Sequence, residues 1–175
     1  QRIVDQFDAL GVTNYATVWQ SATYGSTYGG DDWAAWYPGD EYVDWFGMSY
    51  FGTGVPAYDE WLALARAHGK PVMLAEATPR GFDLMDDNPD TVWNSWFAPF
   101  IEFVHTNDDV VKAVAYINVN WDEQAMWQGQ GWGDTRVQAN DTLLARWLAE
   151  IQTDTWLQAA PDLFATLGYA SPGPN

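Results

Sequence analysis

Glu76 is the residue of this 175-residue chain that is best placed to do chemistry. It follows five apolar residues, 71–75, which predict a short buried strand with the carboxylate at its carboxyl end. A charge there is costly unless a partner or a reaction uses it. Catalytic carboxylates occupy such positions in barrel enzymes, but a structural glutamate bonded to a neighbouring loop is the commoner case. Position alone therefore leaves both interpretations open.

Three other segments change from apolar to polar or aromatic residues where a strand is expected to end. They are Trp19-Gln20, Ser49-Tyr50 and residues 118–121, the last of which ends in Trp121. If the strands are parallel and adjacent, these side chains converge with Glu76 at one edge of the sheet. Indole faces stack on the C–H surfaces of sugars, while amides and carboxylates bond the hydroxyls. The pattern thus predicts a carbohydrate site, with Trp19 and Trp121 as substrate-binding residues.

The twelve tryptophans divide into two groups by their spacing. Those at helical spacing are expected in the core: Trp61, Trp93, Trp96 and Trp147. Those in loops or at strand ends are candidate platforms for a sugar: Trp19, Trp33, Trp36, Trp121, Trp127 and Trp132. Some of the second group are expected only to anchor loops, since aromatic rings often serve that purpose.

The elements that would position these residues alternate between strands and helices. Strands are expected at 14–19, 43–49, 71–75 and 112–117, and helices at 57–67, 90–104, 140–151 and 161–167. Residues 1–10 resemble the end of an amphipathic helix, which predicts that the chain begins inside an element. The alternation indicates parallel strands with helical crossovers. It fits part of a (β/α)8 barrel, with an open doubly wound sheet as the alternative.

The charge balance excludes several classes of protein. The chain has 7 basic and 24 acidic side chains, a net charge of −17, so a phosphate backbone would be repelled and no nucleic-acid partner is expected. Its aromatic content of 17% is too high for a disordered acidic tail. No apolar run approaches the roughly 20 residues of a membrane span, so no membrane partner is expected either.

Metal and cofactor sites are not expected. The chain has no cysteine and only two histidines, His68 and His105, each at the end of an expected helix where a structural role suffices. The acidic residues between 83 and 90 lack the glycine and final glutamate of a calcium loop. We also find no phosphate-binding glycine loop and no serine-hydrolase elbow.

Several segments resemble glycoside hydrolase family 26. Residues 37–47, YPGDEYVDWFG, resemble the family segment Tyr-Pro-Gly-Asp-x-Tyr-Val-Asp-x-x-Gly, and residues 70–76, KPVMLAE, resemble its seventh strand. Residues 14–19 resemble the fifth strand, and residues 132–136 resemble a segment after the eighth. The similarity covers nearly the whole chain. It implies the C-terminal half of a (β/α)8 barrel, strands 5 to 8 with their helices.

This resemblance also implies an activity and roles for particular residues. The family carries out retaining hydrolysis of β-linked polysaccharides, mannan being the commonest substrate, and its members are secreted. By position, Glu76 would be the nucleophile, Tyr50 would donate a hydrogen bond that orients it, and Trp121 would form the floor of the subsite for the attacked sugar. Around Tyr50 the chain departs from the family, with Ser49-Tyr50-Phe51 in place of an aspartate-glycine-tyrosine-asparagine arrangement.

A second departure concerns the acid/base carboxyl that retaining hydrolysis requires. In the family it lies on the fourth strand, which would precede Gln1. Asp122 and Glu123 lie beyond a strand in a loop, which is a poor position for that role. Residues 1–175 are therefore expected to be a fragment that needs its N-terminal half-barrel and is inactive alone. Two other hypotheses are a noncatalytic carbohydrate-binding module and a half-barrel scaffold.

Overall fold

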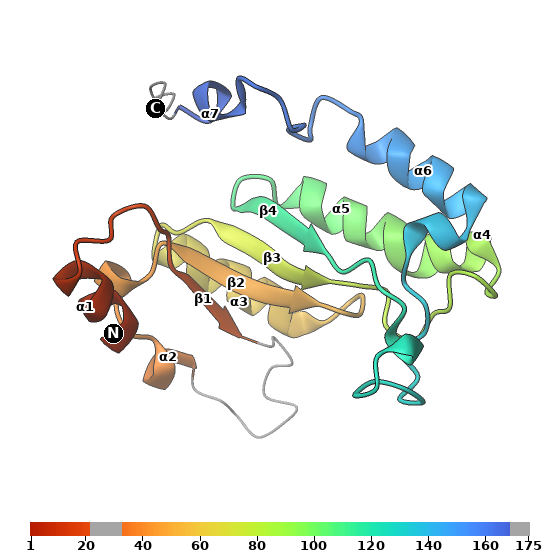
Figure 1. Ribbon diagram of the computed structural model, residues 1–175, viewed down its shortest axis with the longest axis horizontal. Helices are drawn as coiled ribbons and strands as arrows, with labels where there is room; N and C mark the ends of the chain where they lie inside the picture. Colours follow the sequence, from red (N-terminus) through yellow and green to blue (C-terminus); the bar gives the residue numbers. More distant parts are fainter. Residues whose placement is uncertain (22–32, 169–175) are drawn as a thin grey trace.

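The structure, a computed structural model, describes residues 1–21 and 33–168. Four parallel strands form one sheet in the order β1-β2-β3-β4. The strands are β1 (Val18–Ser21), β2 (Trp45–Tyr50), β3 (Val72–Ala77) and β4 (Val111–Tyr116). Each strand lies next to its successor in the chain, and both β1 and β4 are edge strands (Figure 1). All four predicted strands are present, with shifted boundaries.

Helices precede β1, connect the strands and follow β4. The longer ones are α1 (Arg2–Ala9), α3 (Pro56–Ala67), α5 (Ala98–Thr106) and α6 (Asp141–Ile151). The short ones are α2 (Trp33–Trp36), α4 (Pro89–Val92) and α7 (Leu163–Thr166). Helix α3 matches its prediction, and a π-helical turn at Trp93–Phe97 joins α4 to α5 in the place of one predicted helix. Within the described residues, no helix is both long and apolar enough to cross a membrane.

The ring contacts between helices and strands lie on one face of the sheet. Tyr50 of β2 stacks on Tyr58 of α3 and meets Phe100 of α5, while Tyr116 of β4 meets Trp147 of α6. A doubly wound sheet carries helices on both faces, whereas a barrel carries them only on the outside. The one-sided packing therefore favours the barrel over the doubly wound sheet.

The core lies between this face and the helices. Trp61 and Trp96 are buried there, and Trp93 and Trp147 pack against it, which confirms the predicted division for these four indoles. The parallel sheet with helical crossovers also excludes the β-sandwich that a carbohydrate-binding module would usually have. The opposite face of the sheet is where the candidate site lies.

Candidate active site

Glu76 faces away from the helices because β3 contains one extra residue. Met48 of β2 pairs with Leu74, but the next residue, Ser49, pairs with Glu76, so Ala75 forms a β-bulge. Leu74 is fully buried in the core. Regular alternation from Leu74 would place Glu76 on that same face. The bulge thus brings Glu76 to the other face, beside Ser49, and β3 continues past the strand end predicted at residue 75.

One oxygen of Glu76 accepts two hydrogen bonds from neighbouring strands. Ser49 Oγ donates to Oε2 at 2.8 Å, and Gln20 Nε2 donates to the same atom at 3.0 Å. Gln20 Nε2 also lies 3.3 Å from Ser49 Oγ. Within the described part of the chain, Oε1 of Glu76 accepts no hydrogen bond. The carboxylate is therefore held at one oxygen, with the other left available to a ligand.

Gly47 provides the space that Gln20 occupies. The two residues pair across β1 and β2, and a Cβ at position 47 would lie 2.7 Å from Val18 Cγ1 and 3.0 Å from Gln20 Cβ. The first distance is too short for a real contact and the second is tight, so any larger residue at position 47 would force the β1 side chains to shift. The glycine thereby lets β1 approach β2 closely enough for the amide of Gln20 to reach Glu76.

Tyr50 does not lie beside Glu76. Successive residues of a strand face opposite sides, so Tyr50 points away from the face that Ser49 shares with Glu76. Its ring is only 2% exposed and packs against Tyr58 and Phe103 in the helix layer. Burial raises the pKa of the Tyr50 hydroxyl well above its usual range. The hydrogen bonds that Glu76 accepts come from Ser49 and Gln20, and Tyr50 donates none to it.

Trp19 likewise lies on the helix side of the sheet. Its indole stacks on Trp61 of α3 at 4.8 Å and meets Phe46 and Tyr37 edge-on. The adjacent Gln20 faces Glu76. In both strand-end pairs, Trp19-Gln20 and Ser49-Tyr50, the aromatic residue packs on the core and the polar residue bonds the carboxylate of Glu76. Trp19 is therefore not on the face where a substrate-binding residue was expected.

Trp121 belongs to an aromatic cluster in the loop that follows β4. It lies in the 3-10 turn Trp121–Glu123, is 9% exposed, and contacts both Trp127 and Trp132. Its Nε1 donates to Thr135 Oγ1 at 3.1 Å. The cluster follows β4 at the same end of the sheet as Glu76, and its three rings contact one another within the loop. Trp36, by contrast, is 77% exposed, and Trp33 packs on Trp61.

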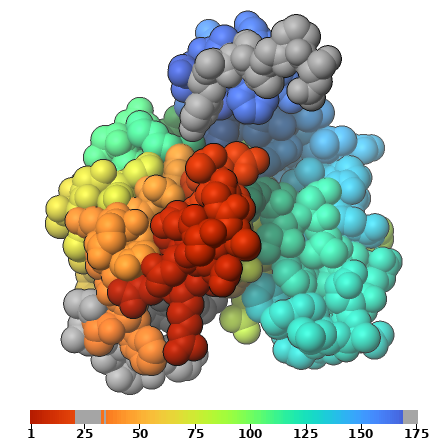
Figure 2. All heavy atoms as spheres, turned by 60° about the vertical axis from the view of Figure 1, so that its left-hand side comes forward, coloured from red at the N-terminus to blue at the C-terminus, as the bar shows by residue number. Residues whose placement is uncertain are grey.

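The loops after β2, β3 and β4 are joined at this end of the sheet. Trp132 meets Phe51 edge-on and lies under the guanidinium of Arg80, whose Cζ is 4.6 Å from the ring centre. The backbone N–H of Gly81 donates to Trp132 O, and that of Leu84 donates to Asp134 O. In the space-filling view the loop after β4 (teal) forms a projecting mass, separated by an indentation from the N-terminal segment (Figure 2).

An ion pair between a buried carboxylate and a partly exposed guanidinium closes this loop. The carboxylate of Asp134, 2% exposed, accepts from Arg136 Nη2 at 2.6 Å and from the Arg136 backbone N–H at 3.0 Å. Burial opposes ionisation of Asp134, but these interactions with Arg136 outweigh it and hold the pKa of that carboxyl below its usual range. A depressed pKa means that the pair stabilises the folded state above about pH 4 and that this contribution is lost as the pH falls further.

We expect Asp134→Asn to lower the free energy of unfolding at pH 7 by about 1 kcal/mol, which is below the roughly 1.5 to 3 kcal/mol of a buried hydrogen bond to a charged group because Arg136 is partly in water. The difference between the variant and the unsubstituted protein should narrow below about pH 4, where the wild-type pair is itself lost. Urea unfolding at pH 7 and pH 3 measures both. A difference that is the same at the two pH values would contradict this account.

Both histidines pair with carboxylates outside the site. His68 Nδ1 lies 2.8 Å from Asp40 Oδ1, and His105 Nε2 lies 2.7 Å from Glu150 Oε1. These contacts agree with the structural roles predicted for them. Over residues 1–21 and 33–168, no group of three or more histidine or acidic side chains is arranged to hold a metal ion.

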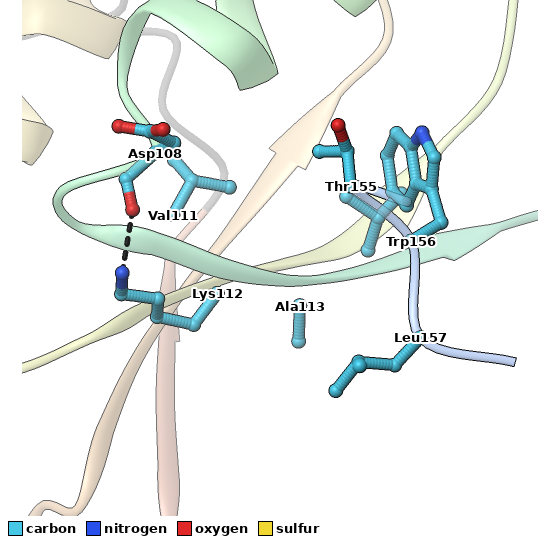
Figure 3. Close-up of a pocket in the computed structure, with 8 residues that line it drawn as sticks. Asp108, Val111, Lys112, Ala113, Thr155, Trp156 and Leu157 are labelled. Carbon is cyan, nitrogen blue, oxygen red and sulfur yellow. Dashed lines mark hydrogen bonds between the residues drawn. The ribbon is translucent and has the colours of Figure 1, made fainter. Parts of the chain in front are cut away.

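A hollow of about 510 Å³ runs along the free edge of β4, and it is not part of this site. Val111 and Ala113 line one side, and residues 155–157 face them from across the hollow (Figure 3). Lys112 Nζ donates to Asp108 O at its rim. Because Val111 begins the strand, the hollow opens at the amino end of β4, whereas Glu76 is near the carboxyl end of β3.

The chain is similar in sequence to two glycosidases. It is 34% identical to a β-1,3-xylanase from Alcaligenes sp., over 91% of this chain and 39% of the relative. It is also 34% identical to the β-1,3-xylanase TXYA from Vibrio sp., over 90% of this chain and 39% of that protein. The chain thus spans about two fifths of the length of these relatives. No family model matches it.

Solved structures of glycoside hydrolase family 26 share the fold. A modular endo-β-1,4-mannanase from Cellulomonas fimi superposes with a TM-score of 0.54 at 20% identity, over 89% of this chain and 35% of its own. GH26C from Muricauda sp. gives 0.57 at 15% identity, over 90% of this chain and 42% of its own. The fold is therefore half of a (β/α)8 barrel, which is the fold that the resemblance to family 26 implies.

Proposed function

We propose that residues 1–175 form the C-terminal half of the catalytic barrel of a retaining glycoside hydrolase, with Glu76 as its nucleophile. One observation carries this proposal: a carboxylate near the carboxyl end of a parallel strand is held by two donors at Oε2, while Oε1 has no partner among the described residues. A carboxylate held in this way is oriented to attack the anomeric carbon of a bound sugar. The glycosidase relatives support the same class of reaction.

Retaining hydrolysis needs a second carboxyl group, roughly 5 to 5.5 Å from the nucleophile, to protonate the leaving oxygen and then activate water. Asp122 is a poor source for it, because its Oδ1 accepts the backbone N–H of Gly129 at 3.2 Å and so helps to fold the loop. We propose that the acid/base is supplied by an N-terminal half-barrel that completes the sheet at the free edges of β1 and β4. The isolated chain is then inactive.

For the substrate we propose β-1,3-xylan, with β-1,4-mannan as the second candidate. The resemblance of the sequence to family 26 by itself favours mannan as the substrate. The β-1,3-xylanases are 34% identical to the chain, whereas the Cellulomonas fimi mannanase is 20% identical and supports only the fold. Both polymers are neutral, which suits a chain with a net charge of −17. An extracellular location is proposed on the same family resemblance.

The test uses the longest native polypeptide that contains this chain, together with the chain alone. We expect reducing ends to be released from β-1,3-xylan by the long form only, and NMR of the first products to show the β-anomer. Release of reducing ends from mannan but not from β-1,3-xylan would show that the substrate is β-1,4-mannan. Initial α-products would exclude a retaining mechanism, and binding without cleavage by the long form would favour a noncatalytic protein.

A further inference from the structure

We propose that Ser49 and Gln20 are positioning residues for Glu76, which together hold Oε2 and reserve Oε1 for attack on the sugar. This inference rests on the proposed role of Glu76 as the nucleophile. It concerns two side chains to which neither the family resemblance nor the sequence patterns gave this role. It gives Gln20 and Ser49 the function of holding Glu76, which their neighbours Trp19 and Tyr50 cannot perform because they face the helices.

The two hydrogen bonds constrain the carboxylate more tightly than either could alone. Ser49 approaches Oε2 from β2 at 2.8 Å, and Gln20 reaches the same atom from β1 at 3.0 Å. Donors from two strands fix both the position of Oε2 and the rotation of the carboxylate plane. Because both donors are on Oε2, Oε1 has no hydrogen-bond partner among the described residues and is left for a ligand.

The backbone keeps these donors in place. Ser49 and Glu76 are paired across β2 and β3, and Gln20 is paired with Gly47, two residues before Ser49 on the same face of β2. Ser49 is only 5% exposed, so its hydroxyl has little access to water as an alternative partner. Gln20 is exposed, so a substitution there can be made with little effect on the core.

The chemical consequence lies in the first step of the reaction. A lone pair of Oε1 forms the bond to the anomeric carbon while the bond from that carbon to the leaving group breaks, and the leaving group departs with the electron pair. A carboxylate that rotates freely spends less time with Oε1 in line for this attack. Loss of a donor should therefore slow formation of the glycosyl-enzyme more than it weakens substrate binding.

The experiment measures that step directly in the longest native polypeptide. A β-1,3-xylobioside activated as its 2-deoxy-2-fluoro glycosyl fluoride should label Glu76, with fluoride leaving without a proton donor, and intact-mass spectrometry gives the rate. We expect Ser49→Ala to label about 10- to 100-fold more slowly, the range for a lost hydrogen bond to a charged group. KM for β-1,3-xylan should change by no more than about twofold, since binding contacts are retained.

Three further variants separate positioning from general structural damage. Ser49→Thr keeps the hydroxyl and should label within a few-fold of the unsubstituted protein. Gln20→Glu replaces a donor by a carboxylate of nearly the same shape and should label at least as slowly as Ser49→Ala. Tyr50→Phe, on the same strand but facing the helices, should leave the rate unchanged. Thermal unfolding midpoints establish that each variant is folded. If Ser49→Ala fails to fold, the substitution at exposed Gln20 still tests the inference.

The possible failures are distinguishable. Labelling of Glu76 at an unchanged rate in both Ser49→Ala and Gln20→Glu overturns this inference and leaves the nucleophile in place. A loss in Tyr50→Phe as large as that in Ser49→Ala overturns it in favour of the tyrosine. Labelling of a residue other than Glu76 overturns the proposed function, and the inference with it.

Discussion

Glu76→Gln in the longest native polypeptide is expected to lower kcat on β-1,3-xylan on the order of 10³- to 10⁵-fold, because an amide cannot form the glycosyl ester of the retaining mechanism. The amide has nearly the shape of the carboxylate, so KM should change little. The release of reducing ends under saturating substrate measures kcat. Glu60→Gln is the matched control, since Glu60 is exposed on α3 in the helix layer; its activity should be unchanged.

An added nucleophile provides a second measurement on the same residue. Glu76→Ala leaves a space into which azide can enter, attack the anomeric carbon and displace the leaving group, giving a glycosyl azide of α-configuration. We expect azide to restore part of the activity on an aryl glycoside with a good leaving group. Full activity of Glu76→Gln without azide would exclude Glu76 as the nucleophile and with it the proposed mechanism.

Gly133→Ala is expected to lower the free energy of unfolding by about 2 to 5 kcal/mol, the sum of a left-handed backbone and an overpacked contact. The backbone φ is +78°, and a Cβ at this position would lie 2.1 Å from the carbonyl oxygen of Phe82. That contact is with backbone of the loop after β3, which cannot move aside as a flexible side chain could. The substitution should therefore separate the loops after β3 and β4.

Gly131→Ala is the matched control for the loop substitution. Its φ of +71° is similar, but a Cβ there would have no neighbour within 4 Å, so only the cost of about 1 kcal/mol for the backbone conformation remains. Denaturant unfolding of the two variants measures the difference. Equal losses of stability would show that the close approach of the two loops contributes nothing.

The fold could be predicted because its signals are local. Apolar runs, helical spacing and a left-handed glycine after helix α1 at Gly11 mark the elements without reference to the rest of the molecule. The boundaries were less accurate: the strand expected at 14–19 begins at Val18, because Tyr15 instead packs on Phe7 of α1. That contact joins two elements, and no spacing within either one predicts it.

The sequence predicts that both strand-end pairs converge with Glu76, but not which residue of each pair contacts it, for a related reason. Each strand-end pair offers one residue to each face of the sheet, and the pair itself does not tell which residue faces the site. One signal was present: Phe46, Met48 and Tyr50 are large and apolar at a spacing of two, which predicts a shared core face and leaves Ser49 on the other. No such signal existed for the bulge at Ala75, which depends on how β3 pairs with both of its neighbours.

The β3 bulge also bears on how related sequences should be aligned. Leu74 pairs with Val114 of β4 and Ala77 pairs with Tyr116. Over this stretch β3 therefore has one residue more than β4, as it also has one more than β2. Removing Ala75 would restore regular pairing with β2, and with β4 beyond Leu74, and would keep Glu76 opposite Ser49; the separate irregularity between Val72 and Met73 on the β4 side would remain. A relative without the bulge would thus carry its glutamate immediately after the counterpart of Leu74, and a one-residue gap at this point would mark a change of backbone shape with the glutamate retained.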